Sequence, residues 1–277
     1  MTDRPTAAPP RPVTPVAILA SLLQDVQTRL EATGADPSLR ADLRRATALA
    51  AGLDPYLAAC TTPESPALAR LAGRTAAQDW DALGDRSRPG ALEQEMLSGH
   101  VEGQLLKLLI RLSGARRALD VGTFTGYSAL AMAEALPPGG QVVTCEVDER
   151  VAAIARQAFQ HAPHGDRIAL RLGPALDSLH ALADEGATFD LAFLDADKGG
   201  YVEHLQVLLD RGLIGPGGLI CADNTLLQGQ AYLADDRSAA GEAIARFNRA
   251  VAADPRVEQV LLPLRDGVTL IWRTDAP

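Results

Sequence analysis

Residues 118–128 decide the fold class and read Ala118-Leu119-Asp120-Val121-Gly122-Thr123-Phe124-Thr125-Gly126-Tyr127-Ser128. A short apolar run leads into a glycine-rich turn, and a helical pattern follows the turn. Glycine lets the backbone turn sharply and leaves room for a ligand, while the N-terminus of a helix favours an anionic group. The stretch therefore predicts a strand, a ligand-binding turn and a helix, in that order.

Further short apolar runs, separated by stretches of helical length and period, surround this turn. These runs are 117–121, 141–145, 167–172, 189–194 and 218–222. Their alternation with helices predicts an α/β fold with a doubly wound, mostly parallel, Rossmann-like sheet. The last two runs, 257–262 and 268–272, lie too close together for a crossover helix. They predict an antiparallel C-terminal hairpin, which completes a seven-stranded sheet.

The region before the sheet has helical patterns throughout. Apolar residues recur at helical spacing from Ile18 to Leu30, a second pattern has Gly52 as a stop signal, and Ser65-Pro66 is typical of the start of a third helix. We expect three parts in the chain. They are a disordered lead over 1–15, an N-terminal helical region over 16–98 and an α/β domain over 99–277.

Composition narrows the possible partners and the compartment. With 277 residues, of which 47% are hydrophobic, the chain can bury one core, and its net charge of −9 argues against nucleic acid or an anionic membrane as a partner. It has no apolar run of membrane-spanning length and no signal-peptide core. The cysteines Cys60, Cys145 and Cys221 lack CxxC spacing, which argues against a disulfide framework. We expect a soluble cytoplasmic protein with a small-molecule substrate.

The spacing of the glycine-rich turn distinguishes between cofactors. Dinucleotide-binding proteins prefer GxGxxG. The D-x-G-x-x-x-G pattern from Asp120 to Gly126 better suits the aminoacyl and ribose portions of S-adenosylmethionine. Glu146, at the end of the next strand, can accept hydrogen bonds from both ribose hydroxyls, and Gly173-Pro174-Ala175 would line the adenine. The turn could be purely structural and Glu146 a surface carboxylate, but their coincidence favours a cofactor site.

Acidic residues end the fourth and fifth predicted strands. Asp195 and Asp197 follow the fourth strand, and Asp223 and Asn224 follow the fifth. Ligands bind at the carboxyl ends of strands in open α/β sheets. Asp195, Asp223 and Asn224 would give a divalent cation, Mg²⁺ above all, hard oxygen ligands and leave positions for two neighbouring substrate oxygens. The alternative is that these residues cap helices or form turns.

Chelation of a diol by such a cation would make a hydroxyl acidic enough to act as a nucleophile and would orient it. Lys198 could then take the proton or stabilise the oxyanion. A solvated surface lysine is the competing interpretation. Asp195 and Lys198 are therefore the candidate catalytic residues.

Together these motifs resemble the cation-dependent O-methyltransferase family that contains caffeoyl-CoA and catechol O-methyltransferases. The similarity extends from about Leu97 to Arg273, and its marks lie at 102–104, 122–128, 173–176, 194–198, 223–226 and 252–256. The resemblance implies a homodimer, metal ligands at Asp195, Asp223 and Asn224, and a catalytic Lys198. The expected cofactor-binding residues, including those of the glycine-rich turn, are Glu102, Gly122, Thr123, Gly126, Ser128, Glu146, Ala175, Asp195 and Asp197.

Departures from the plant members of the family bear on the acceptor. The segment 96–101 lacks their Ser-Ala-Asp before Glu102, so His100 either faces the acceptor or is an ordinary loop residue. A coenzyme A thioester is not indicated. Segments 49–57, 60–65 and 92–100 are similar to the O-methyltransferases of mycosporine-like amino acid biosynthesis. That similarity implies the enediol-type cyclohexenone desmethyl-4-deoxygadusol as the acceptor.

Other functions remain open at this point. A catechol-type aromatic acceptor fits the same metal chemistry, and the same fold can methylate carbon or nitrogen. A nicotinamide-binding oxidoreductase or a catalytically silent binding module could also be built on a doubly wound sheet. The absence of GxGxxG and the terminal hairpin count against the oxidoreductase. The joint presence of the metal, lysine and cofactor candidates counts against the silent module.

Overall fold

The computed structural model describes residues 11–33, 36–83, 92–233, 235 and 237–274. Its seven strands form one sheet in the order β3-β2-β1-β4-β5-β7-β6. The strands β1 to β5 pair in parallel, and β7 pairs antiparallel with both β5 and β6. The predicted sheet and its terminal hairpin are confirmed. The bounds are β1 Arg117–Val121, β2 Gln141–Glu146, β3 Ile168–Leu172, β4 Phe189–Leu194, β5 Ile214–Ala222, β6 Val257–Leu262 and β7 Val268–Arg273.

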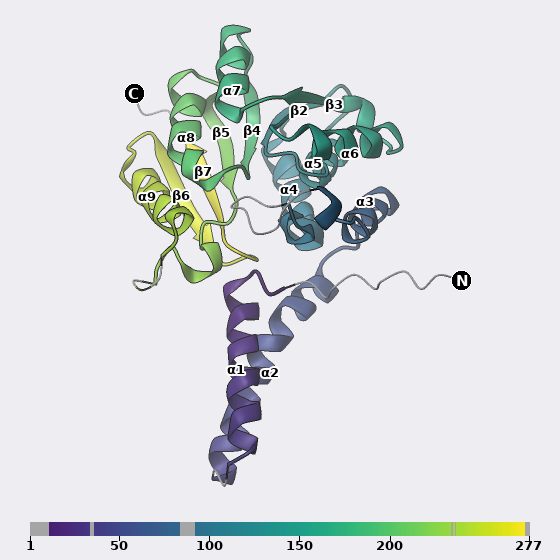
Figure 1. Ribbon diagram of the computed structural model, residues 1–277. Coiled ribbons are helices and arrows are strands. Elements are labelled where there is room, and N and C mark those ends of the chain that lie inside the picture. The colour runs from purple at the N-terminus through teal and green to yellow at the C-terminus, as the bar shows by residue number, and fades with distance from the viewer. Residues whose placement is uncertain (1–10, 34–35, 84–91, 234, 236, 275–277) are drawn as a thin grey trace, which may run out of the picture.

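Helices cover both faces of this sheet (Figure 1). One buried apolar cluster joins the sheet to α3, α4, α5 and α6, and a second joins it to α7, α8 and α9. The helices are α1 Pro15–Glu31, α2 Pro37–Cys60, α3 Pro66–Ala76, α4 Gly99–Ser113, α5 Tyr127–Ala135, α6 Glu149–Gln160, α7 Ala175–Asp184, α8 Tyr201–Asp210 and α9 Ala239–Ala253. Short 3-10 turns are η1 Asp81–Leu83, η2 Gln94–Met96, η3 Gly165–Arg167, η4 Lys198–Gly200 and η5 Leu227–Gly229.

The first two helices form an antiparallel arm that projects from the body of the molecule (Figure 1). Helix α1 begins where Thr14 caps it by accepting a hydrogen bond from the Ala17 amide, with Pro15 in the first turn. Residues 1–10 of the expected lead lie outside the described residues, whereas Thr14 is buried. The base of the arm is therefore packed against the rest of the chain.

The stop expected at Gly52 is wrong, because α2 continues to Cys60 with Pro55 inside it. A glycine in a helix costs about 1 kcal/mol and a proline more, but neither forbids a helix. The Thr14 hydroxyl donates a hydrogen bond of 2.9 Å to the Asp54 carboxylate within this stretch. Tertiary contacts with the start of α1 thus support the last turns of α2. By contrast, the predicted helix start at Ser65-Pro66 is confirmed, since the Ser65 hydroxyl caps α3.

The register of the central strands brings the acidic residues together. Leu194 of β4 pairs with Val121 of β1 on one side and with Ala222 of β5 on the other. The ladder continues one step further, because the Asp195 amide donates to the Val121 carbonyl at 2.8 Å and the Asp223 amide donates to the Leu194 carbonyl at 3.0 Å. Asp195 and Asp223 therefore leave the same edge of the sheet side by side.

Gly122 follows β1 at this edge in a conformation that only glycine adopts readily. Its φ is 110°, and a Cβ atom at this position would lie 1.9 Å from the carbonyl oxygen of Asp195. The turn can pass this close to β4 only without a side chain.

We expect Gly122→Ala to lower the free energy of unfolding by about 2 to 4 kcal/mol, because both the backbone conformation and the contact become strained. Gly52→Ala is the matched control. It lies in an exposed helix with nothing within 4 Å of the added Cβ, and it should raise the stability by about 0.5 to 1 kcal/mol. Urea unfolding of both variants checks the pair. A Gly122→Ala protein as stable as the wild type would contradict the close approach.

Candidate active site

The glycine-rich turn between β1 and α5 is fixed by backbone hydrogen bonds to β2. The amides of Gly122 and Thr123 both donate to the Cys145 carbonyl at 3.0 Å, and the Gly126 amide donates to the Thr123 carbonyl at 2.8 Å. Gly126 has a φ of 98°, and a Cβ there would lie 2.5 Å from the Phe159 ring. The turn is therefore a preformed cradle at the start of α5.

Glu146 faces this cradle from the end of β2. Its Oε2 accepts a hydrogen bond of 2.7 Å from the Phe124 amide, and its Oε1 accepts from the Val147 and Asp148 amides at 2.9 Å. Burial raises the pKa of Glu146, while these amides lower it. A carboxylate held in this way keeps lone pairs for the two hydroxyls of a ribose. The amide of Gly173 donates to the Glu146 carbonyl at 2.8 Å, which brings the start of α7 at Ala175 to the same edge.

Asp120, the first residue of the D-x-G-x-x-x-G pattern, is a buried carboxylate. It is fully inaccessible and accepts a hydrogen bond of 2.5 Å from the Thr144 hydroxyl. Burial raises the pKa of Asp120 to about 7, against the lowering effect of the Thr144 and Ser128 hydroxyls. An aspartate inside an apolar strand was the signal that could have identified it.

The raised pKa of Asp120 gives a testable dependence of stability on pH. The folded state keeps the proton up to about pH 7, whereas an unfolded aspartate loses it near about pH 4. Between these values the folded state binds more protons, so this residue lowers stability as the pH rises.

We expect Asp120→Asn to gain stability relative to the wild type as the pH rises from about 4 to about 7, by up to about 1.4 kcal/mol per pH unit in that window. Urea unfolding without ligand at both pH values measures the difference. Asp166→Asn, an exposed aspartate, controls for the loss of one charge. A difference between Asp120→Asn and the wild type that does not change with pH would contradict the assignment.

The metal-ligand candidates lie next to the cradle. Asp223 is buried, its Oδ1 accepts a hydrogen bond of 2.6 Å from the Asn224 amide, and Asn224 has a φ of 55°. Burial and then the negative charge of Asp195 raise the pKa of Asp223 to about 6. The buried carboxylate of Asp223 and the partly buried carboxylate of Asp195 repel each other, and a cation would be attracted to them.

The chemistry of this set fits a hard divalent cation. In the described part of the chain, no three His, Cys, Asp or Glu side chains form a metal-sized group. The residues that would hold a cation here are Asp195 and Asp223, through their carboxylates, and Asn224, through its amide oxygen. All three are oxygen ligands of the kind that Mg²⁺ prefers.

Lys198 is part of this site and is not a solvated surface lysine. Its Nζ donates to Asp195 Oδ1 at 2.7 Å and to the Tyr201 hydroxyl at 2.8 Å. The Tyr201 hydroxyl in turn lies 3.2 Å from the Asp223 carbonyl. Burial lowers the pKa of Lys198, but the charge of Asp195 and the other neighbours raise it above its usual value. The side chain is thus an ammonium donor held against the carboxylates.

Glu102 and Arg265 adjoin the same carboxylates from the other side. Glu102, in the first turn of α4, is only 1% exposed, and Arg265 Nε lies 3.6 Å from its Oε2. Burial and then Asp223 raise the pKa of Glu102 well above its usual value. The structure places Glu102 with the metal-ligand candidates. Arg265, in the loop between β6 and β7, was missed because a single arginine in a loop carries no sequence signal.

Two further predicted residues have clear positions. Asp197 precedes η4 and accepts a backbone hydrogen bond of 3.1 Å from the Gly200 amide. His100, in the first turn of α4, lies with its Nε2 2.6 Å from the Thr62 carbonyl oxygen. The imidazole therefore joins α4 to the segment between α2 and α3, and one of its nitrogens is already engaged.

The N-terminal helical region reaches the cradle itself. The Trp80 ring stacks on Phe124 of the turn with centroids 5.0 Å apart, and the hydroxyls of Thr75 and Thr125 lie 2.9 Å from each other. Leu68 belongs to the same buried cluster as the sheet. The expected boundary between 16–98 and 99–277 is thus crossed by one continuous core.

Fold and site together define an α/β protein of the class that binds an adenosine-containing cofactor at the carboxyl edge of its sheet. The sequence profile of the O-methyltransferase family matches residues 86–274, and the chain belongs to this family. Within the described residues, no helix is long and apolar enough to cross a membrane.

Individual relatives agree with this family. Catechol O-methyltransferase domain-containing protein 1 of Mus musculus is 42% identical over 174 residues, which cover 62% of this chain and 66% of that protein. Caffeoyl-CoA O-methyltransferase 2 of Zea mays is 40% identical over 181 residues, covering 62% and 68%. The match spans less than two thirds of the mouse relative and of tricin synthase 2 from rice, at 66% and 63% of their lengths.

A solved structure extends the similarity over more of the chain. The O-methyltransferase from Bacillus cereus in complex with SAH superposes with a TM-score of 0.69 at 30% identity, covering 80% of this chain and 97% of that one. The predicted resemblance to the caffeoyl-CoA and catechol O-methyltransferases is therefore confirmed at the level of the family.

Proposed function

We propose that this protein transfers the methyl group of S-adenosylmethionine to one oxygen of a small vicinal diol or enediol, with a divalent cation holding the acceptor. The observation that carries the proposal is the convergence of Asp195, Asp223 and Lys198 at the sheet edge next to the Gly122 turn. The SAH complex of the Bacillus cereus relative supports the cofactor assignment. Glu146, facing the turn, would hold the ribose.

The cation, held by Asp195, Asp223 and Asn224, would lower the pKa of a chelated hydroxyl and fix its orientation. Methyl transfer forms an oxygen–carbon bond as the sulfonium–carbon bond breaks, so the acceptor oxygen must carry negative charge. Lys198, held by Asp195 and Tyr201, would donate a hydrogen bond to that oxygen and stabilise its charge. In this role Lys198 acts as an ammonium and not as the base, so the proton of the chelated hydroxyl would pass to solvent before the methyl transfer.

For the acceptor we favour the cyclohexenone enediol desmethyl-4-deoxygadusol. The support is the similarity of segments 49–57, 60–65 and 92–100 to the O-methyltransferases of mycosporine-like amino acid biosynthesis. Asp54, Leu57 and His100 from these segments line one cavity. A catechol-type acceptor is the second candidate, because relatives carry catechol and caffeoyl-CoA in their names. Methylation of carbon is a further alternative. Membership of the O-methyltransferase family argues against the oxidoreductase hypothesis.

We further propose that the protein is a cytoplasmic homodimer. Support for a reducing compartment comes from its three cysteines, which are all free thiols. Support for a dimer comes from the arm, where Leu22, Leu49 and Tyr56 expose large apolar side chains. Such residues are normally covered by another surface.

Two kinds of perturbation should distinguish loss of the metal from loss of cofactor binding. EDTA or Asp223→Ala should reduce methyl transfer at least about a hundredfold, because the acceptor loses its ionised, oriented state. S-adenosylhomocysteine should still bind with nearly wild-type affinity. Glu146→Gln should instead weaken S-adenosylhomocysteine binding by about tenfold and leave Mg²⁺ binding intact. Calorimetry measures both affinities, and full activity in EDTA would refute the metal role.

The acceptor class can be decided by a methylation assay with Mg²⁺ present. We expect the deoxygadusol precursor to give the highest kcat/KM, simple catechols a lower one and caffeoyl-CoA the lowest, because the sequence lacks the plant segments before Glu102. NMR of the product locates the new methyl group. A preference for caffeoyl-CoA would overturn the proposed acceptor, and a methyl group on carbon would overturn the proposed chemistry.

A further inference from the structure

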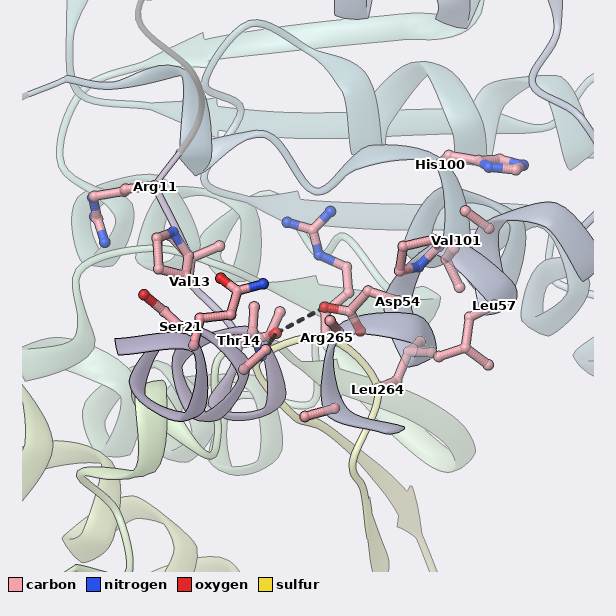
Figure 2. A pocket seen from close by; sticks show the side chains of 18 residues that line it. Arg11, Val13, Thr14, Ser21, Asp54, Leu57, His100, Val101, Leu264 and Arg265 are labelled. Atoms are coloured by element: carbon pink, nitrogen blue, oxygen red, sulfur yellow. Dashed lines mark hydrogen bonds between the residues drawn. The ribbon is translucent and has the colours of Figure 1, made fainter. Parts of the chain in front are cut away.

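A cavity of about 630 Å³ lies at the base of the arm, beside the start of α4 and the loop between β6 and β7 (Figure 2). More than half of the lining residues belong to α1 and α2, and most of those are small or apolar, such as Ala17, Ala51 and Leu57. The segment 11–14 before α1, the start of α4 at Val101 and the loop between β6 and β7 at Arg265 complete it. Its size suits one small molecule, and its wall is largely apolar with a few polar groups.

Several polar groups of the cavity are already committed to protein partners. Thr14 and Asp54 are hydrogen-bonded to each other, as the dashed line in Figure 2 shows. Arg11 forms an ion pair with Glu93. His100 uses one ring nitrogen on the Thr62 carbonyl. These polar groups therefore have fewer hydrogen-bonding positions left for a ligand.

Arg265 differs from them, because most of its donors are not taken up by the described residues. The guanidinium donates one hydrogen bond of 3.2 Å, from Nη2 to the Leu97 carbonyl. Its ion pair with Glu102 is 3.6 Å long, beyond a good hydrogen bond. An arginine has five N–H donors arranged to bind a carboxylate or a similar pair of oxygens. Figure 2 shows the Arg265 side chain among the residues that line the cavity.

The backbone of the loop between β6 and β7 and the neighbouring Gly99 allow the Arg265 side chain to lie at the cavity. Arg265 adopts a left-handed φ of 49°. Its Nη1 lies where a Cβ on Gly99 would come within 2.5 Å, so the guanidinium rests against a position without a side chain. At its inner end it adjoins Glu102, which lies beside Asp223. Arg265 therefore stands between the cavity and the metal-ligand candidates.

Building on the proposed function, we propose that this cavity binds the body of the methyl acceptor and that Arg265 binds an anionic oxygen of the acceptor remote from the chelated diol. The preferred substrates are then small anionic diols or enediols. The arm is the specificity element, because α1 and α2 supply more than half of the lining residues. Arg265 is a specificity-determining residue, and Lys198 remains the group beside the reacting oxygen.

The test uses two probes that share a catechol and differ in charge, 3,4-dihydroxybenzoate and neutral catechol. Their binding to the full-length protein with Mg²⁺ and S-adenosylhomocysteine is measured by calorimetry. We expect Arg265→Gln to weaken binding of the anionic probe by about tenfold or more, with little change for catechol. Arg265→Lys should restore part of the loss. Arg246→Gln, an exposed arginine on α9, is the control and should leave both affinities unchanged.

A second pair of variants tests the cavity without altering charge. Ala51→Trp places a large side chain in the cavity, and Ala59→Trp places the same side chain at an exposed position of α2 outside the cavity lining. Ala51→Trp should weaken both probes and leave S-adenosylhomocysteine binding unchanged, whereas Ala59→Trp should change neither.

The outcomes separate this inference from the proposed function. Wild-type affinities in Arg265→Gln and Ala51→Trp, in a protein that methylates diols, would overturn the inference and leave the function standing. A wild-type protein that binds neither probe would overturn the inference. If it also transferred no methyl group to any diol or enediol, the proposed function would fail as well.

Discussion

The close contact between the backbone of Gly122 and the carbonyl of Asp195 is the constraint on which the site depends. Because Gly122 has no side chain, the turn after β1 can lie directly against the end of β4. The strand register then places Asp223 of β5 one position further along the same edge. The glycine-rich turn and the carboxylates of Asp195 and Asp223 thus share one edge, and a side chain on Gly122 would push them apart.

Carboxylates that lie together at a buried edge repel one another. Two positively charged side chains partly offset this repulsion. Lys198 lies against Asp195, and Arg265 lies near Glu102. Burial and mutual repulsion still raise the pKa of Asp223 and of Glu102. The remaining repulsion between the carboxylates would be relieved by a bound cation, as the proposed function requires.

The N-terminal helices have two distinct structural roles. Helix α3 and the following Trp80 belong to the core of the body, where the ring of Trp80 stacks on the glycine-rich turn. Helices α1 and α2 instead form an arm whose base closes a cavity next to Arg265 (Figures 1 and 2). A single helical region in the sequence is therefore divided between support of the glycine-rich turn and one wall of this cavity.

The sequence by itself determined the strands, the terminal hairpin, the glycine-rich turn and the acidic strand ends, because hydrophobic period and turn chemistry are local properties. It could not determine that α2 continues through Gly52 and Pro55, since contacts with the start of α1 outweigh the local cost. Nor could it place Arg265 or Asp120 in the site. Arg265 lies near Glu102 only because the fold brings α4 next to the loop between β6 and β7. The pKa of Asp120 rises only because the folded chain buries it. Tertiary structure decided these features because they depend on which distant segments become neighbours.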